Sequence, residues 1–276
     1  MNRHLTLRRQ FIGALAATPL LVGWPALAQG KGMVLRPRGG FRFLPGNPVY
    51  AGGAVAESGF AIVHALLSRW LPLEQGYALV ERHLATVGRP IEALCGMQLR
   101  LPRQLSFEDF TAFNVAYVER LQRWGLINDK LNPVSRTNVA PSVQAPGEAS
   151  LHAFSYTVPY SGGMKSFTMS GIVERGPGGS TIAQGDDSSE GMRQKFAYVV
   201  GSVTDRLAEL GFQWADATHI DLYAAAELPG AFDILAARAS GALPRGVRWH
   251  HGRPPVVGLE LELEARAVLR EEAVPA

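Results

Sequence analysis

The sequence predicts an α+β protein in which one order of strands and helices occurs twice. Each half shows the element order β-β-α-β-α-β-β along the chain. Apolar residues at helical spacing mark the helices, and short alternating or β-branched runs mark the strands. A length of 276 residues suits two small domains, and 47% hydrophobic with 18% charged residues suits a packed core. We therefore expect a first domain over residues 41–158 and a second over residues 164–270.

The first half follows a Gly/Pro/Arg-rich stretch, residues 30–40, which predicts a tether. Both of its helices are expected because apolar residues recur every three or four positions and a glycine follows the last turn. Ser106 is the expected N-cap of the second helix. The expected elements are two short strands within 41–56, a strand within 57–72, a helix over 73–88, a strand over 91–101, a helix over 106–125, and strands over 132–141 and 150–158.

The second half repeats this order after a joint at residues 159–163. Its long helix has one apolar face and is expected to stop at Gly211. A loop rich in Gly, Ser and Asp precedes that helix. The expected elements are a strand over 165–174, a helix over 190–211, a strand over 217–225, a shorter helix over 229–240, and strands over 247–251 and 258–268.

The first 28 residues predict an export signal. Arg8-Arg9-Gln10-Phe11-Ile12 fits the twin-arginine pattern, an apolar run follows, and small residues offer a cleavage site after Ala28. An ordinary secretory signal that contains two arginines is the alternative. We expect twin-arginine export to the periplasm, with no stable membrane association afterwards, because no later segment is long and apolar enough to span a bilayer. Cleavage would remove three of the 27 basic residues and none of the 24 acidic ones. The near-neutral mature chain argues against nucleic acid as a partner.

Four segments resemble motifs of the RidA/YjgF family, in that family's order. Residues 109–117 resemble its DF..FN..Y helix, 132–139 its P-x-R-x-x-V strand, 167–171 an early strand that ends in Ser-Gly, and 260–265 its closing E-[IV]-E-A strand. The chain thus resembles a tandem-domain member of the family that carries a twin-arginine signal. The resemblance implies two RidA-like (chorismate-mutase-like) domains, each a mainly antiparallel sheet with two helices on one face. It also implies trimers with ligand clefts between neighbouring sheets.

The resemblance also implies an activity. Members of the best-known branch hydrolyse enamines and imines to ketones and ammonia, so we expect a hydrolase or deaminase that acts on a small carboxylated molecule in an inter-domain cleft. One alternative is a non-catalytic periplasmic ligand-binding protein. A second is a chorismatase-like enzyme, although chorismate is a cytoplasmic metabolite. We expect no cofactor and no metal, because no H-x-x-x-H or C-x-x-C pattern occurs.

Arg136 and Glu262 are the leading site candidates. A guanidinium can hold a carboxylate through two parallel hydrogen bonds, and arginines at this position of the family hold the substrate's carboxylate. A partly desolvated glutamate can take and return the proton that imine hydrolysis requires. Glu262 alternates with leucines and shares one strand face with Glu260 and Glu264, so a solvent-exposed sheet face is the alternative.

The two halves carry these motifs in complementary ways. The closing strand of the first half lacks the glutamate, and the second half has no unambiguous arginine, since Arg245, Arg248 and Arg253 compete. We therefore expect a composite cleft in which Arg136 faces residues of the other half. The candidate residues are Glu262 and Ser170 for catalysis, and Arg136, Asn114, His152 and Arg248 for substrate binding.

Overall fold

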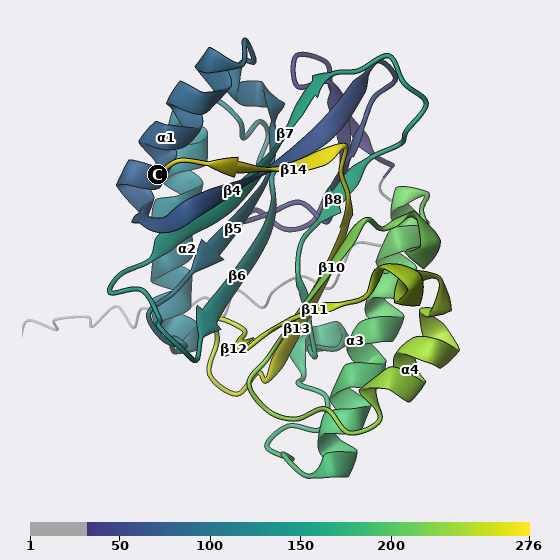
Figure 1. Ribbon diagram of the computed structural model, residues 1–276. Helices are drawn as coiled ribbons and strands as arrows, with labels where there is room; N and C mark the ends of the chain where they lie inside the picture. Colours follow the sequence, from purple (N-terminus) through teal and green to yellow (C-terminus); the bar gives the residue numbers. More distant parts are fainter. Residues whose placement is uncertain (1–31) are drawn as a thin grey trace, which may run out of the picture.

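The computed structural model describes residues 32–276, which form two β-sheets that face each other between outer layers of helices (Figure 1). The leader and cleavage site expected within residues 1–28 lie outside this range. The six-stranded sheet consists, in spatial order, of β12 (Gly252–Arg253), β6 (Ser135–Pro141), β5 (Leu94–Arg100), β7 (Ser150–Pro159), β4 (Phe60–Pro72) and β14 (Arg270–Val274). The eight-stranded sheet consists of β1 (Val34–Arg36), β2 (Phe41–Leu44), β3 (Gly53–Ala56), β8 (Phe167–Met169), β13 (Leu261–Ala267), β10 (His219–Ala224) and β11 (Arg248–His250), with β9 (Ile172–Val173) beside β13.

The predicted α+β class is confirmed, and both sheets are mainly antiparallel. Helices α1 (Leu73–Thr86) and α2 (Phe107–Arg123) cover the outer face of the six-stranded sheet, and α3 (Ser189–Leu210) and α4 (Ala231–Arg238) cover the other (Figure 1). In the first half β5 pairs parallel with β6 and antiparallel with β7, and in the second half β10 pairs in the same way with β11 and β13. The repeated element order therefore corresponds to a repeated sheet arrangement.

Strand membership crosses between the halves of the chain. Strands β1 to β3 join the eight-stranded sheet through β8, whereas β14 pairs parallel with β4 in the six-stranded sheet. Two expectations were wrong here. Residues 34–36 were expected in a tether but form β1, because Val34 packs on a small buried cluster around Phe41 and Phe43. The single strand expected over 165–174 is divided into β8 and β9, because Ser170 and Gly171 turn to bond with the backbone of Arg136.

Helix ends follow local signals in the sequence. The hydroxyl of Ser106 accepts a hydrogen bond from the backbone N–H of Asp109 at 3.0 Å, which caps α2. Gly211 ends α3 in the left-handed conformation at φ 81°, as glycine does most readily. Each helical layer encloses its own apolar cluster, one under α1 and α2 and the other under α3 and α4. No helix among residues 32–276 is long and apolar enough to cross a membrane.

The layer between the two sheets has an apolar part around Phe41 and Ile62 and a polar part along β13. Along β13, the leucines and alanines at alternate positions pack under α3, while Glu262, Glu264 and Arg266 point toward the six-stranded sheet. All three charged side chains are buried, at 3%, 4% and 3% exposure. The solvent-exposed alternative for this strand face is therefore wrong for Glu262 and Glu264, because the other sheet covers them.

Candidate active site

A cavity opens at one edge of this polar layer, where both sheets and α2 meet. It brings residues from the two halves of the chain together, with Arg136 on β6 and Glu262 on β13. Its lining residues are Tyr50, Phe107, Phe110, Arg136, Asn138, Gly171, Val173, Arg175, Pro255, Val256, Leu259 and Glu262. We call this the Arg136–Glu262 cavity.

Arg136 lies in an aromatic enclosure. Its side chain is 4% exposed, and the guanidinium carbon lies 4.7 Å from the ring centre of Tyr117 and 5.3 Å from that of Tyr50. Its Nη1 donates to the side-chain oxygen of Asn114 at 2.9 Å. Within residues 32–276, no carboxylate lies at ion-pair distance from it. Rings and an amide oxygen stabilise a cation less than a carboxylate does. The guanidinium is therefore suited to binding an anion that enters the cavity.

Glu262 is the acidic group of the cavity. Burial raises the pKa of this carboxyl to about 8, nearby Glu264 adds to the rise, and the backbone N–H of Asn138 and the charge of Arg136 oppose it. Its Oε2 is buried and has no hydrogen-bond partner among residues 32–276. A carboxyl group in this state is protonated at neutral pH and can donate a proton to a bound molecule.

Two residues before β9 shape this part of the site. The hydroxyl of Ser170 accepts from the backbone N–H of Arg136 at 2.8 Å and donates to the carbonyl of Ala51 at 2.6 Å. Through these two bonds the Ser170 hydroxyl holds β6 beside the end of β8. A Cβ atom on Gly171 would overlap the carboxylate of Glu262, so the side chain of Glu262 occupies the space that glycine leaves.

Asn138 and Arg175 are site residues that the sequence analysis missed. Asn138 is 3% exposed, and neither atom of its side-chain amide has a hydrogen-bond partner in the part of the chain that the structure describes. It lies two residues after Arg136 on the same strand, and the period-two rule could have identified it. Arg175 brings a second guanidinium to the cavity, with its guanidinium carbon 5.7 Å from the ring centre of Phe107. Arg175 lies between β9 and a glycine-rich turn, and no local pattern of the sequence marked it as a site residue.

His152 and Arg248 lie away from the Arg136–Glu262 cavity. His152 lines a second cavity, together with Arg100 and Tyr223. Arg248 is paired with acids, since its Nε lies 3.0 Å from Asp221 and its Nη2 lies 3.1 Å from Glu271. The structure thus brings together Arg136, Asn114, Ser170 and Glu262, and it places His152 and Arg248 elsewhere.

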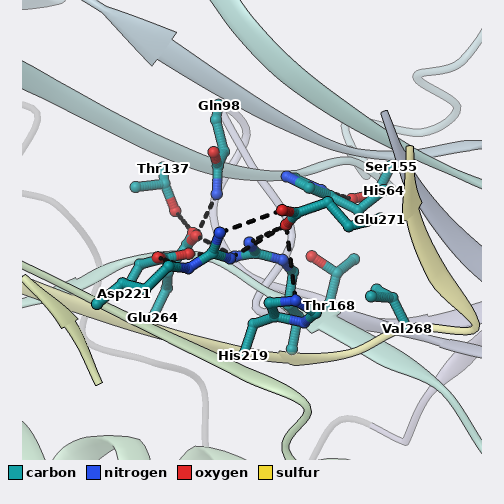
Figure 2. A network of polar contacts seen from close by, with 12 residues as sticks. His64, Gln98, Thr137, Ser155, Thr168, His219, Asp221, Glu264, Val268 and Glu271 are labelled. Atoms are coloured by element: carbon teal, nitrogen blue, oxygen red, sulfur yellow. Dashed lines mark hydrogen bonds and ion pairs between the residues drawn. The ribbon is translucent and has the colours of Figure 1, made fainter. Parts of the chain in front are cut away.

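A charged network fills the layer beside the cavity (Figure 2). Arg266 contacts Asp221, Glu264 and Glu271, with Nη1 3.0 Å from Glu264 and Nη2 2.9 Å from Glu271. Gln98 and Thr137 of the six-stranded sheet donate to Glu264, and Figure 2 shows both side chains pointing toward its carboxylate. The network therefore joins the two sheets directly behind Glu262.

The arrangement can bind a carboxylate and transfer a proton within one buried space. Arg136 supplies an un-neutralised cation, Glu262 supplies a carboxyl with a raised pKa, and the amide of Asn138 supplies both a donor and an acceptor. Among the described residues, no group of three or more His, Cys, Asp or Glu side chains is arranged to hold a metal ion.

Comparison with known proteins identifies relatives along almost the whole chain. The family described as 2-aminomuconate deaminase CnbZ matches residues 33–272. The chain is 39% identical over 241 residues to 2-amino-5-chloromuconate deaminase from Comamonas testosteroni, which covers 84% of this chain and 95% of that protein. Among solved structures, a chorismatase matches with a TM-score of 0.46 at 15% identity, covering 92% of this chain and 96% of that one. A Rid-family protein, YyfB from Yersinia pestis, matches with a TM-score of 0.32 at 20% identity, covering 41% and 84%.

Proposed function

The chain belongs to the 2-aminomuconate deaminase CnbZ family, and we propose that it is a deaminase whose active site is the Arg136–Glu262 cavity. The substrate class is a carboxylated enamine of the 2-aminomuconate type. We also propose that the chain is a tandem-domain relative of the RidA/YjgF proteins. One observation carries it: a buried guanidinium with no ion-pair partner among the described residues and a carboxyl with a raised pKa line one cavity.

The charges of the cavity suit such a substrate. A 2-aminomuconate is a flat six-carbon diene with a carboxylate at each end and an amino group beside one of them. Arg136 and Arg175 offer two guanidinium groups in one cavity, and each can hold a carboxylate through paired hydrogen bonds. Phe107 and Phe110 give the same cavity apolar walls for a conjugated chain.

Glu262 would carry out the proton transfers of the hydrolysis. The protonated carboxyl first donates its proton to the enamine carbon next to the amino-bearing carbon, which gives an iminium ion. The resulting carboxylate then accepts a proton from water as the water oxygen bonds to the iminium carbon. Glu262 then donates this proton to the nitrogen as the carbon–nitrogen bond breaks and accepts the hydroxyl proton as the carbonyl forms, so ammonia leaves and a ketone remains. The balance is one enamine and one water to one ketone and one ammonia, with Glu262 protonated again.

The test is ammonia release from 2-aminomuconate by purified wild-type protein, Glu262→Gln and Arg136→Lys. Glu262→Gln keeps the shape but cannot transfer a proton, so we expect kcat to fall by roughly 10²–10⁴-fold with little change in KM. Arg136→Lys keeps the charge but loses the two-pronged geometry, so we expect KM to rise at least about tenfold. The exposed Glu148→Gln is the matched control and should behave as wild type. Full activity in both site variants would refute the assignment, and binding without turnover by wild type would favour a ligand-binding protein.

We also propose that the protein is exported and that it assembles as a trimer. Twin-arginine export would deliver the folded protein to the periplasm. The family resemblance supports a trimer, in which the outer strands of each chain could meet those of its neighbours. Fractionation of cells that express the full-length chain tests the location, and light scattering of the mature protein tests the assembly.

A further inference from the structure

A second cavity lies between the same two sheets, and the deaminase mechanism does not use it. It is bounded by β4, β5, β6, β7 and β12 of one sheet and by β10 and β11 of the other. In the first half β5 lies between β6 and β7, and in the second half β10 lies between β11 and β13. The first cavity lies beside β6 and β13, and the second lies beside their counterparts, β11 and β7. The side chains that matter here are Trp70, Arg100, His152, Tyr223, Trp249 and His250.

Three hydrogen-bond donors meet in this cavity. Arg100 is 3% exposed, its Nη1 donates to the carbonyl of Leu99 at 3.0 Å, and within residues 32–276 it forms no ion pair with a carboxylate. The hydroxyl of Tyr223 is buried and has no hydrogen-bond partner among the described residues. Trp70 Nε1 donates to His152 Nδ1 at 2.9 Å, which leaves the ring proton of neutral His152 on Nε2. A guanidinium, a hydroxyl and an imidazole N–H are together the donor set that a carboxylate accepts from.

The walls of the cavity are aromatic. The rings of Tyr223 and His250 stack with centres 4.7 Å apart and an interplanar angle of 19°. The guanidinium of Arg100 lies 5.2 Å from the ring centre of Tyr223. Trp70 and Trp249 line the same space, and Trp249 is 49% exposed although its indole N–H donates to the carbonyl of Ala224 at 2.9 Å. Flat rings around a cation favour a flat, conjugated anion over a branched or saturated one.

We propose that this second cavity is a separate binding site for a planar, conjugated carboxylate, held by Arg100, Tyr223 and His152. It binds this ligand without hydrolysing it. Among the described residues, no aspartate or glutamate lines this cavity, whereas Glu262 lines the first. Asp221 lies nearby, but it contacts His250, Arg248 and Arg266. The first cavity therefore combines guanidinium groups with a carboxyl, whereas the second has a guanidinium and, among the described residues, no carboxyl.

The test is calorimetric titration with muconate, which has the carboxylates and the diene but no amino group to release. We expect two muconate sites per wild-type chain and one in Arg136→Met. In the Arg136→Met background, adding Tyr223→Phe should weaken the remaining site about tenfold, since one hydrogen bond to a charged group is lost. Adding Arg100→Lys in the same background should weaken it more. Loss of all binding in Arg136→Met, or residual binding that neither second change weakens, would overturn the proposal.

Tryptophan fluorescence gives an independent readout of this cavity. Trp70 and Trp249 line the second cavity, and no tryptophan within residues 32–276 lines the first. Muconate should therefore change the fluorescence of Arg136→Met, and Trp249→Phe in that background should reduce the change. Tyr223→Phe removes only a hydroxyl that has no partner, so it keeps the proposal testable if Arg100→Lys does not fold. A fluorescence change that disappears with Arg136→Met alone would count against the second site.

Discussion

At the scale of single residues, the site depends on how little room surrounds Glu262. Its carboxylate fills the space beside Gly171, and Oε2 is left without a partner. The backbone of Gly171 does not have positive φ, so glycine is needed there for space and not for conformation. The position and the protonation of the Glu262 carboxyl therefore depend on Gly171, which has no side chain.

Gly171→Ala should impair catalysis more than folding. The new methyl group would meet the flexible end of the Glu262 side chain, which can move aside at modest cost to stability. We expect kcat to fall at least about tenfold, because a misplaced catalytic group costs rate steeply, with a thermal midpoint close to that of wild type. Gly163→Ala is the matched control, since nothing lies within 4 Å of its added Cβ. Equal kcat for the two variants would show that the position of Glu262 does not matter.

The protonation of Glu262 predicts a pH dependence of stability. Its pKa is about 8 in the folded protein and rises from an ordinary 4.5, so between these values the folded state holds a proton that the unfolded state releases. The stabilisation is complete below the ordinary pKa and is lost as pH rises through the folded pKa, by at most about 1.4 kcal/mol per pH unit. Between about pH 6 and about pH 8, the free energy of unfolding measured in urea should fall less in Glu262→Gln than in wild type. Identical losses would contradict the raised pKa.

At the scale of elements, local signals sufficed for the helices and for most strands. Apolar stripes that end at a glycine identified α1, α2 and α3 close to their observed bounds, because these signals act within a few residues. The same signals failed for β14. Its sequence, Arg270-Glu271-Glu272-Ala273-Val274, has no apolar alternation, and pairing with the distant β4 makes it a strand. Such tertiary pairing leaves no trace in a short window of sequence.

Deletion of residues 270–276 should expose an edge of the six-stranded sheet. It removes the parallel pairing of β14 with Val63 to Leu67 and the two bonds that Glu271 makes to Arg248. Several backbone hydrogen bonds at about 1 kcal/mol each predict a fall of the thermal midpoint by roughly 10 °C, with association through the open edge of β4. Calorimetry and light scattering measure both effects. The exposed Arg270→Gln is the control for lost charge, and a truncated protein that melts like wild type would contradict the role of β14.

At the scale of the whole molecule, the two sheets meet through charge along β13 and through a small apolar cluster that includes Phe41 and Ile62. Arg266 contacts three carboxylates there, and Gln98 and Thr137 of the opposite sheet donate to one of them (Figure 2). The sequence indicated that Arg136 and Glu262 come from different halves, and the structure places both in one cavity. It did not indicate Arg175, Arg100 or Tyr223, because these residues meet only where strands from different halves face each other.

Arg266→Met should destabilise the whole molecule. Removing the cation leaves the carboxylates of Asp221, Glu264 and Glu271 close together in a buried layer. Breaking a buried ion pair lowers the free energy of unfolding by about 3–5 kcal/mol, and we expect a loss of that size. Burial and repulsion would then raise the pKa values of these carboxyls, so the loss should shrink as the pH is lowered and they become protonated. Urea unfolding at two pH values measures both effects. Arg270→Met breaks an exposed pair with Glu272 and should cost at most about 1 kcal/mol. Equal costs for the two variants would contradict a central role for the network.

The late position of β14 in the chain bears on how the protein is made. A ribosome releases β4 and β7 well before it has synthesised the strand that borders β4, and β3 must likewise wait for β8. Neither sheet can be completed during translation of the first half. The nascent chain therefore carries open strand edges until synthesis is nearly finished, and folding that depends on such distant pairings is slow. Chaperones that shield unpaired strands would have their greatest effect on yield in that interval.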